Sequence, residues 1–212
     1  MLKYQQTNLF SEDELSPRTD AERNEVLNAF SPNALTIINA ILGAGDNYLT
    51  FADNHYFARQ QPNFAPCNIN GLILEELVKT GLFNPRPMNN NTSQCVLLYN
   101  NFTIWIKKID GTLKPRVNKT KSSYKKAYQM EEQGDKSPVL VLGYQLDDSQ
   151  RIQGVHLSYM LGEEHLWLPI NLGDIASRSQ NNSTMLTTEI ADLDVKIKVK
   201  SDRGKKKYLK NG

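Results

Sequence analysis

Side chains that can bind phosphates and bases are concentrated in residues 107–128, which we call the basic segment. Between residues 101 and 130 the sequence has eight Lys or Arg residues and one acid, Asp110, although the whole chain has a net charge of only +2. Lysine and arginine neutralise phosphates, and tyrosine rings stack on bases. The sequence therefore predicts nucleic-acid binding through Lys107, Lys108, Lys114, Arg116, Lys119, Lys121, Tyr124, Lys125, Lys126 and Tyr128.

A second group of cations lies close to the C-terminal end. Residues 196–210 carry eight Lys or Arg residues, and we expect residues 201–212 to form a basic tail that adds to the same interface. Nucleic acid is the favoured partner, because such an excess of cations goes beyond the usual mixing of surface charges. An acidic protein is the alternative partner, since electrostatic steering toward an acidic surface uses the same side chains.

A metal-dependent nuclease is the alternative function. Residues 194–196, Asp-Val-Lys, resemble the (D/E)-x-K element of the PD-(D/E)xK nucleases, in which an Asp and a (D/E)-x-K pair on adjacent strands hold Mg²⁺ and orient water. The resemblance implies Asp174, Asp194 and Lys196 as catalytic residues and Mg²⁺ as cofactor. The leading hypothesis needs no cofactor. Lys198 and Lys200 continue the same charged side, as they would on a solvated strand.

Other residue types that commonly carry chemistry form no recognisable motif. The three histidines, His55, His156 and His165, do not stand at metal-ligand spacings, and a site combining His156, Glu164 and His165 would need a turn to bring them together. Two cysteines are too few for a disulfide framework or a four-thiolate zinc site. No glycine-rich phosphate loop or Gly-x-Ser-x-Gly motif occurs. No motif therefore assigns the chain to an enzyme class.

Two neighbouring apolar segments predict the central element that supports the basic segment. Cys95–Tyr99 and Phe102–Ile106 are rich in β-branched and aromatic residues, and two asparagines between them suit a two-residue hairpin turn. A regular register places Leu97 opposite Ile104. Both faces of this hairpin are apolar, so we expect it in the middle of a sheet, covered on each side. In a less favoured interpretation, the hairpin is the wing of a winged-helix unit.

Apolar residues at helical spacing predict helices before this hairpin. Thr19 and Glu22 have the spacing of a capping box, which would start the first helix. Gly43 and Gly45 are expected to end the second helix, and Gly81 fits the left-handed position after the last one. The predicted helices are about Asp20–Phe30, Pro32–Leu42, about His55–Gln60 and Ile69–Thr80.

Further strands are predicted after the basic segment. Val139–Leu146 and Arg151–Tyr159 form a second predicted hairpin, in which a four-residue loop would place Leu142 opposite Val155 and Leu140 opposite Leu157. Two more strands are expected, and the residues between them, 173–184, are expected to be a polar loop. The two expected strands are Leu166–Ile170, at a sheet edge because of its proline, and Leu193–Val199, which alternates apolar and charged side chains.

These elements predict an α+β protein, with N-terminal helices packed on a mainly antiparallel sheet of about five to seven strands. We expect a polar leader over residues 1–18, a single domain over 19–200 and the basic tail after it. Within the domain, residues 19–81 would be helical and 95–200 would form the sheet. No segment has the composition of a signal peptide or a membrane span, so the sequence predicts a cytoplasmic protein without membrane contact.

Overall fold

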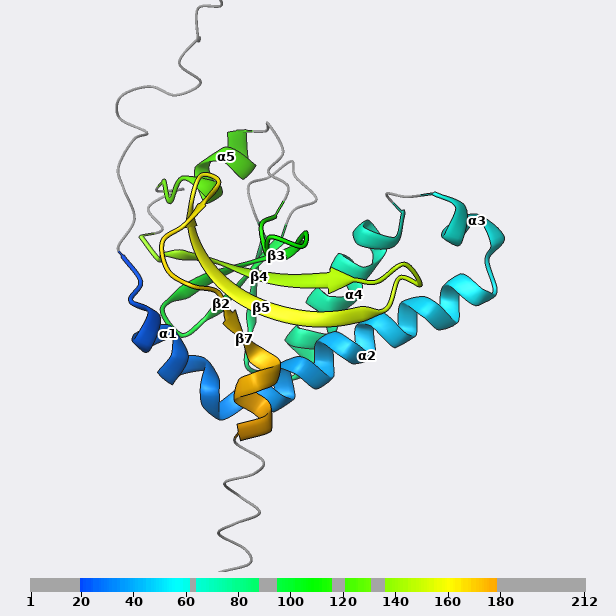
Figure 1. Cartoon of the computed structure of the whole chain (residues 1–212), viewed down its shortest axis with the longest axis horizontal. Helices are drawn as coiled ribbons and strands as arrows, with labels where there is room; N and C mark the ends of the chain where they lie inside the picture. The colour runs from blue at the N-terminus through cyan, green and yellow to red at the C-terminus, as the bar shows by residue number, and fades with distance from the viewer. Residues whose placement is uncertain (1–19, 62–63, 88–94, 116–120, 131–135, 179–212) are drawn as a thin grey trace, which may run out of the picture.

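A sheet packed on N-terminal helices is the architecture of the chain, as a computed structural model shows (Figure 1). The structure describes residues 20–61, 64–87, 95–115, 121–130 and 136–178. The predicted α+β class is confirmed. The sheet has seven strands and is mixed, although most of its strand pairs are antiparallel.

The strands run in the spatial order β1-β2-β3-β4-β5-β6, with β7 paired to β5. The predicted hairpin of β2 and β3 lies inside the sheet, flanked by β1 and β4, so the winged-helix interpretation is wrong. Its register is as predicted, with Leu97 opposite Ile104, and Asn100 in the turn has a φ of 50°. The strand bounds are Asn84–Pro87 for β1, Cys95–Tyr99 for β2, Phe102–Lys108 for β3, Val139–Leu146 for β4, Ile152–Leu161 for β5, Glu164–His165 for β6 and Ile170–Asn171 for β7.

One pair of neighbouring strands is parallel. β3 and β4 align from Thr103 opposite Val139 to Lys108 opposite Tyr144. Parallel neighbours cannot be joined by a tight turn, because the chain has to return to the end at which the first strand began. The connection between them contains the short helix α5, Lys121–Ala127. This crossover is formed by most of the basic segment, which therefore lies across the sheet.

Two of the helices before the sheet, α2 and α4, are longer than their periodicity predicted, whereas α1 and α3 are slightly shorter. α1 spans Arg23–Phe30 and is followed by a short 3₁₀ turn, Ser31–Asn33. Glu22 is the N-cap of α1 and makes no side-chain capping bond, so the predicted capping box is wrong. The remaining helices are α2, Ala34–Asp53, α3, Tyr56–Gln60, and α4, Phe64–Lys79. Gly81 follows α4 with a φ of 73°, as predicted.

Gly43 and Gly45 do not end α2, which continues past both of them to Asp53. A Cβ atom added at Gly45 would lie 2.9 Å from Cδ1 of Ile152 on β5. Glycine at this position therefore allows the helix to approach the sheet closely. Burial of Tyr48 and Ala52 in the following turns stabilises the continuation of the helix.

The main core lies between the helices and one face of the sheet, which we call the helix face. Phe30, Ile41 and Ile73 from the helices are buried there with apolar side chains of β2, β3, β4 and β5. The long helical run over residues 23–53 is apolar enough to span a membrane by length and composition alone. A core helix of a globular domain passes the same test, and Ile41 of this run has 1% of its surface exposed.

The second predicted hairpin forms with a different register. Leu142 lies opposite Leu157 and Leu140 opposite Tyr159, so the predicted pairing was wrong by two residues. The pairing shifts between Gln145 and Leu146, where the strands are irregular. A shift of two residues keeps each side chain on its predicted face, because side chains alternate with a period of two.

The end of the described chain differs from prediction. Residues 166–169 are not a strand, and the short strands β6 and β7 lie before and after them. Residues 172–178 form a helix where a polar loop was expected. Leu172 and Ala176 of this helix are buried against the molecule, which explains why the segment is ordered as a helix despite its polar neighbours. The predicted strand Leu193–Val199, the leader and the basic tail lie outside the described residues.

The other face of the sheet, which we call the crossover face, is covered in part by the chain that follows β3. Ile109 forms an isolated bridge with Pro115 and is buried. A Cβ atom added at Gly143 of β4 would lie 2.6 Å from Cγ2 of Ile109. Glycine at position 143 therefore provides the space in which Ile109 covers the sheet.

Replacing Gly143 with alanine is expected to lower the free energy of unfolding by about 1–3 kcal/mol, because the added methyl group overpacks against Ile109. In an Ile109→Ala background the same replacement should cost less, since the clashing methyl groups are gone. Urea unfolding of the four proteins measures both effects. Gly43→Ala is the control, because a Cβ atom there meets nothing within 4 Å. An equal cost of Gly143→Ala in both backgrounds would contradict this packing.

Candidate nucleic-acid interface

The crossover face carries the residues that make the candidate interface. A second apolar cluster, separate from the main core, lies on this face and includes Trp105 of β3, Val141 of β4, Met160 of β5 and Ala127 of α5. It fixes α5, through Ala127, against the sheet. The basic segment is thus attached to the folded domain at both its ends, at β3 and at α5.

Two lysines from opposite ends of the basic segment meet at one aromatic ring. The Nζ atom of Lys107 lies 4.7 Å from the centre of the Trp105 ring, and the Nζ atom of Lys126 lies 5.5 Å from it. Both distances are within the range of a cation–π interaction. Lys107 and Trp105 are two residues apart on β3 and therefore share a face, whereas Lys126 reaches the ring from α5. Trp105 thus links the end of β3 to the crossover helix.

Burial affects the two lysines differently. Lys126 is 1% exposed, so it does not belong to the accessible cations of the interface. Lys107 is half-buried, and burial lowers the pKa of its ammonium group, although a nearby Cys67 side chain acts in the opposite direction. A partly desolvated ammonium group gains more from an incoming anion than a fully hydrated one does.

Buried polar residues also gather around the crossover. The buried polar and charged side chains among the described residues are Thr103, Ser123, Lys126, Gln129 and Ser158, which come from β3, β5, α5 and the residues directly after α5. Gln129 fastens this region by hydrogen bonds. Its Nε2 atom donates to the carbonyl oxygens of Val139 and Met160, at 2.8 and 3.0 Å, and its Oε1 atom accepts from the Val139 N–H at 2.8 Å.

The acid within the basic segment is engaged in its own loop. Oδ1 of Asp110 accepts hydrogen bonds from the backbone N–H groups of Thr112 and Lys114 and from the Thr112 hydroxyl. These bonds lower the pKa of Asp110, with the Thr112 hydroxyl the largest cause. Asp110 therefore stabilises the turn after β3.

The predicted interface residues fall into three groups. Lys108 and Tyr128 are exposed, while Lys114 and Lys125 are partly exposed. Lys108 follows Lys107 on β3 and therefore projects from the helix face, in register with Tyr144. Lys121 and Tyr124 belong to α5, and nothing more is described of their side chains. Arg116 and Lys119 lie outside the described residues, as do all cations of the 196–210 group. A single interface formed by the basic segment and the cations of residues 196–210 therefore stays a prediction.

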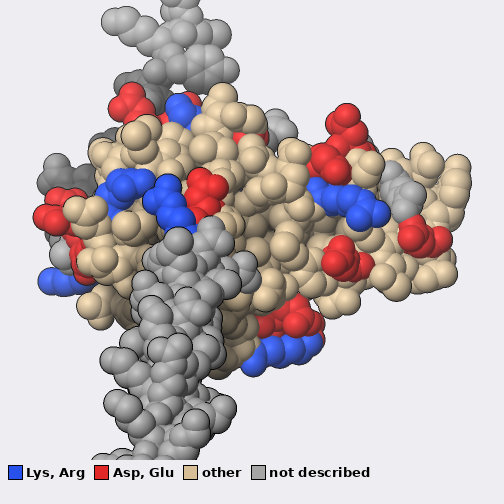
Figure 2. Space-filling view, turned by 60° about the horizontal axis from the view of Figure 1, so that its bottom comes forward, with Lys and Arg blue, Asp and Glu red and all other residues tan. Residues whose placement is uncertain are grey.

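Charges on another side of the molecule are distributed differently. Figure 2 views the molecule from the side of α1 and α2, the lower side in Figure 1. There, basic side chains lie beside acidic ones and most of the surface is uncharged (Figure 2). Elsewhere, on α4, Lys79 makes ion pairs with Glu75 at 2.8 Å and Glu76 at 2.9 Å. These paired charges contrast with the excess of cations that the basic segment brings to the crossover face.

The histidines do not assemble into a site. His55 is exposed on the helical side, and its Nδ1 atom lies 2.8 Å from the carbonyl oxygen of Phe51. His156 lies on β5, opposite Gly143 of β4, and His165 lies on β6. The Nδ1 atom of His156 and both ring nitrogens of His165 are buried without a hydrogen-bond partner. Among the described residues, no group of three or more His, Cys, Asp or Glu side chains is suited to hold a metal ion.

The nuclease alternative finds no carboxylates on the described central strands. Asp174 is exposed on the helix of residues 172–178, while Asp194 and Lys196 lie outside the described residues. Neither β2 nor β3 contains Asp or Glu, and the residue two positions before Lys107 is Trp105. The acidic pair that binds Mg²⁺ in such nucleases is therefore not provided by this hairpin.

Trp105 and Gln129 are the residues of this region that sequence reasoning missed. The i, i+2 spacing of Trp105 and Lys107 on a predicted strand was a usable signal, but the approach of Lys126 depends on the crossover. No family model, curated protein or solved structure matches the chain. The candidate interface is therefore defined by its own geometry, in which an excess of cations surrounds a buried indole ring.

The stability of the protein is expected to fall as the pH decreases below the ordinary histidine pKa of 6.5, because burial lowers the pKa of His156 and Asp174 only partly offsets this effect. The unfolded chain then takes up a proton that the folded chain resists. Urea unfolding between about pH 7.5 and about pH 5.5 measures the loss. His156→Gln should flatten this dependence, whereas His55→Gln, an exposed control, should not. A wild-type pH dependence in His156→Gln would contradict the assignment.

Proposed function

We propose that the chain is an intracellular nucleic-acid-binding protein that contacts the phosphate backbone through its basic segment. The observation that carries the proposal is the meeting of Lys107 and Lys126, from opposite ends of that segment, at the ring of Trp105. A segment fixed in this way presents its cations from a folded surface, and binding then costs less conformational entropy than it would for a free loop.

The electrostatics of the segment favour a polyanion. Burial disfavours the charged form of Lys107 and lowers its pKa, so a phosphate oxygen close to it would stabilise the ammonium group and accept a charge-assisted hydrogen bond. Lys108 is exposed on the opposite side of the same strand end, and Asp110 is held in its own turn. A row of phosphates supplies several anions at the spacing that such a group of cations needs.

The proposed contacts are to the backbone and not to base edges. Lysine ammonium groups bind phosphates as point charges and carry little information about sequence. Trp105 is 4% exposed, so its ring supports the lysines and does not stack on bases. We therefore expect binding to the basic segment to depend strongly on salt and weakly on sequence.

Replacing Lys108 and Lys125 together with glutamine is expected to weaken binding to a short random-sequence duplex. The dependence of log K on log salt should become less steep by about one for each phosphate contact that is lost. Fluorescence anisotropy titrations between about 50 and about 200 mM salt measure both quantities. The two lysines are accessible, so circular dichroism and thermal melting should be unchanged.

Lys79→Gln is the control, because it makes the same type of replacement at one exposed helix position whose charge is paired with acids. It should leave the affinity and the salt slope as they are in the wild type. Wild-type protein that fails to bind any oligonucleotide at about 50 mM salt would contradict the proposal. Binding to an acidic protein under the same conditions would then support the alternative partner for the lysines of the basic segment.

A further inference from the structure

The tip formed by the end of α2 and by α3 exposes aromatic rings. Tyr56 and Phe57 are each 74% exposed, and Phe51 is 41% exposed. The tip is nevertheless anchored, because the buried Tyr48 hydroxyl donates a hydrogen bond to the Ala58 carbonyl oxygen at 3.0 Å. Several exposed aromatic rings close together on an anchored element are unusual and indicate a binding surface.

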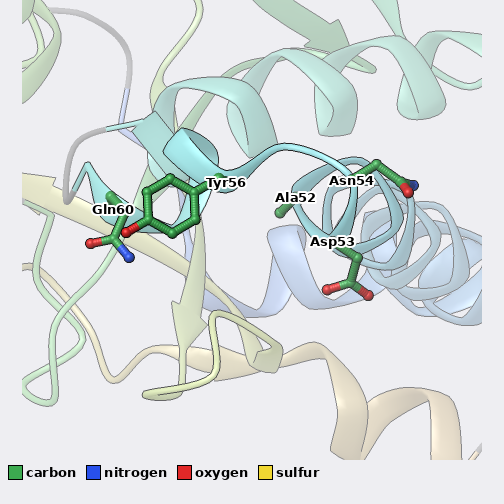
Figure 3. A pocket seen from close by; sticks show the side chains of 5 residues that line it. All are labelled: Ala52, Asp53, Asn54, Tyr56 and Gln60. Atoms are coloured by element: carbon green, nitrogen blue, oxygen red, sulfur yellow. The ribbon is translucent and has the colours of Figure 1, made fainter.

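A pocket opens beside these rings. It has a volume of about 470 Å³ and is lined by Ala52, Asp53, Asn54, Tyr56 and Gln60. Figure 3 shows the Tyr56 ring and the Gln60 amide side by side at one end, with Ala52 and Asp53 at the other. The size lies within the usual range for small-molecule sites, and an aromatic ring with nearby amide and carboxylate groups is suited to a flat, polar, aromatic ligand.

The opening turns of α4 lie between the carboxyl end of β3 and the aromatic tip. Lys108 at the end of β3 pairs with Tyr144 of β4, and the Tyr144 hydroxyl donates a hydrogen bond to the Pro66 carbonyl oxygen of α4 at 3.1 Å. Phe64, at the start of the same helix, stacks on Phe51 at the tip, with ring centres 6.3 Å apart. α4 therefore connects the strand end that carries Lys107 and Lys108 to the aromatic tip.

We infer that this pocket takes an unstacked base of a single-stranded nucleic acid whose backbone is bound by Lys107 and Lys108. The inference rests on the proposed function and adds to it a preference for single strands. Bases in a duplex are stacked and paired, so they do not present their faces to Tyr56, whereas every unpaired base has a face on which an aromatic ring stacks.

The lining of the pocket distinguishes a base from other ligands. Asp53 places a carboxylate at the pocket, which disfavours a phosphate group there and leaves phosphate binding to the lysines. Amide and carboxylate groups also disfavour lipid chains, since buried polar groups without partners are costly. The Gln60 amide can donate and accept hydrogen bonds, as the edges of bases require.

The test compares single-stranded and duplex oligonucleotides of one sequence with wild-type protein and a Tyr56→Ala/Phe57→Ala variant. The variant should lose roughly tenfold in affinity for the single strand, the loss typical of a stacked base. Its duplex affinity and its salt slope should not change. Leu168→Ala is the matched control, because it also truncates a highly exposed apolar side chain, 80% exposed, on another loop.

Free adenosine and cytidine, titrated into the protein and followed by NMR, test the pocket without the backbone. The expected result is a change in the signals of the Tyr56 ring and the Gln60 side-chain amide. Unchanged single-strand affinity in the Tyr56/Phe57 variant, with affinity lost in the Lys108/Lys125 variant, would overturn the inference and leave the proposed function standing. Nucleoside binding at the pocket without any oligonucleotide binding would instead overturn the backbone contacts proposed for the basic segment.

Discussion

The parallel pairing of β3 and β4 is the constraint on which the candidate interface depends. Two parallel neighbours require a crossover, and the crossover here contains most of the basic segment. If the two strands were antiparallel, a short turn could join them, and the chain that carries the lysines would not need to cross the sheet. The pairing also brings Lys126 back to the ring of Trp105, which lies one strand from the point where the crossover ends.

The two faces of the sheet differ for the same reason. The helix face buries apolar side chains from five strands against α1, α2 and α4, whereas the crossover face buries hydroxyl, amide and ammonium groups beside a smaller apolar cluster. A buried lysine costs stability unless its surroundings compensate the lost hydration. The Trp105 ring supplies part of this compensation for Lys126.

Local patterns predicted the elements that depend on local interactions. The central hairpin and its register followed from two apolar runs and an asparagine turn, and Gly81 followed from the left-handed position after a helix. The length of α2 could not be predicted in this way. Glycine usually indicates the end of a helix, and the reason for Gly45 inside α2 is the close approach of Ile152, which is distant in the sequence. Likewise, the register of β4 and β5 differs from the predicted register by two residues, and a shift of two leaves the alternation of faces intact and is therefore invisible to periodicity.

The candidate interface shows the same limit. Composition identified the cations, because an excess of charge can be counted, but burial separates Lys126 from Lys108 although both belong to one basic segment. The aromatic tip shows the same limit for apolar side chains. The sequence around Tyr56 and Phe57 has aromatic residues but no helical or strand periodicity, and aromatic residues are usually buried in a core. Here Tyr56 and Phe57 are exposed, because the short α3 buries only Ala58 among its described side chains. An excess of charge can therefore be counted from sequence alone, whereas the exposure of one lysine or one aromatic ring depends on which neighbour takes the core position.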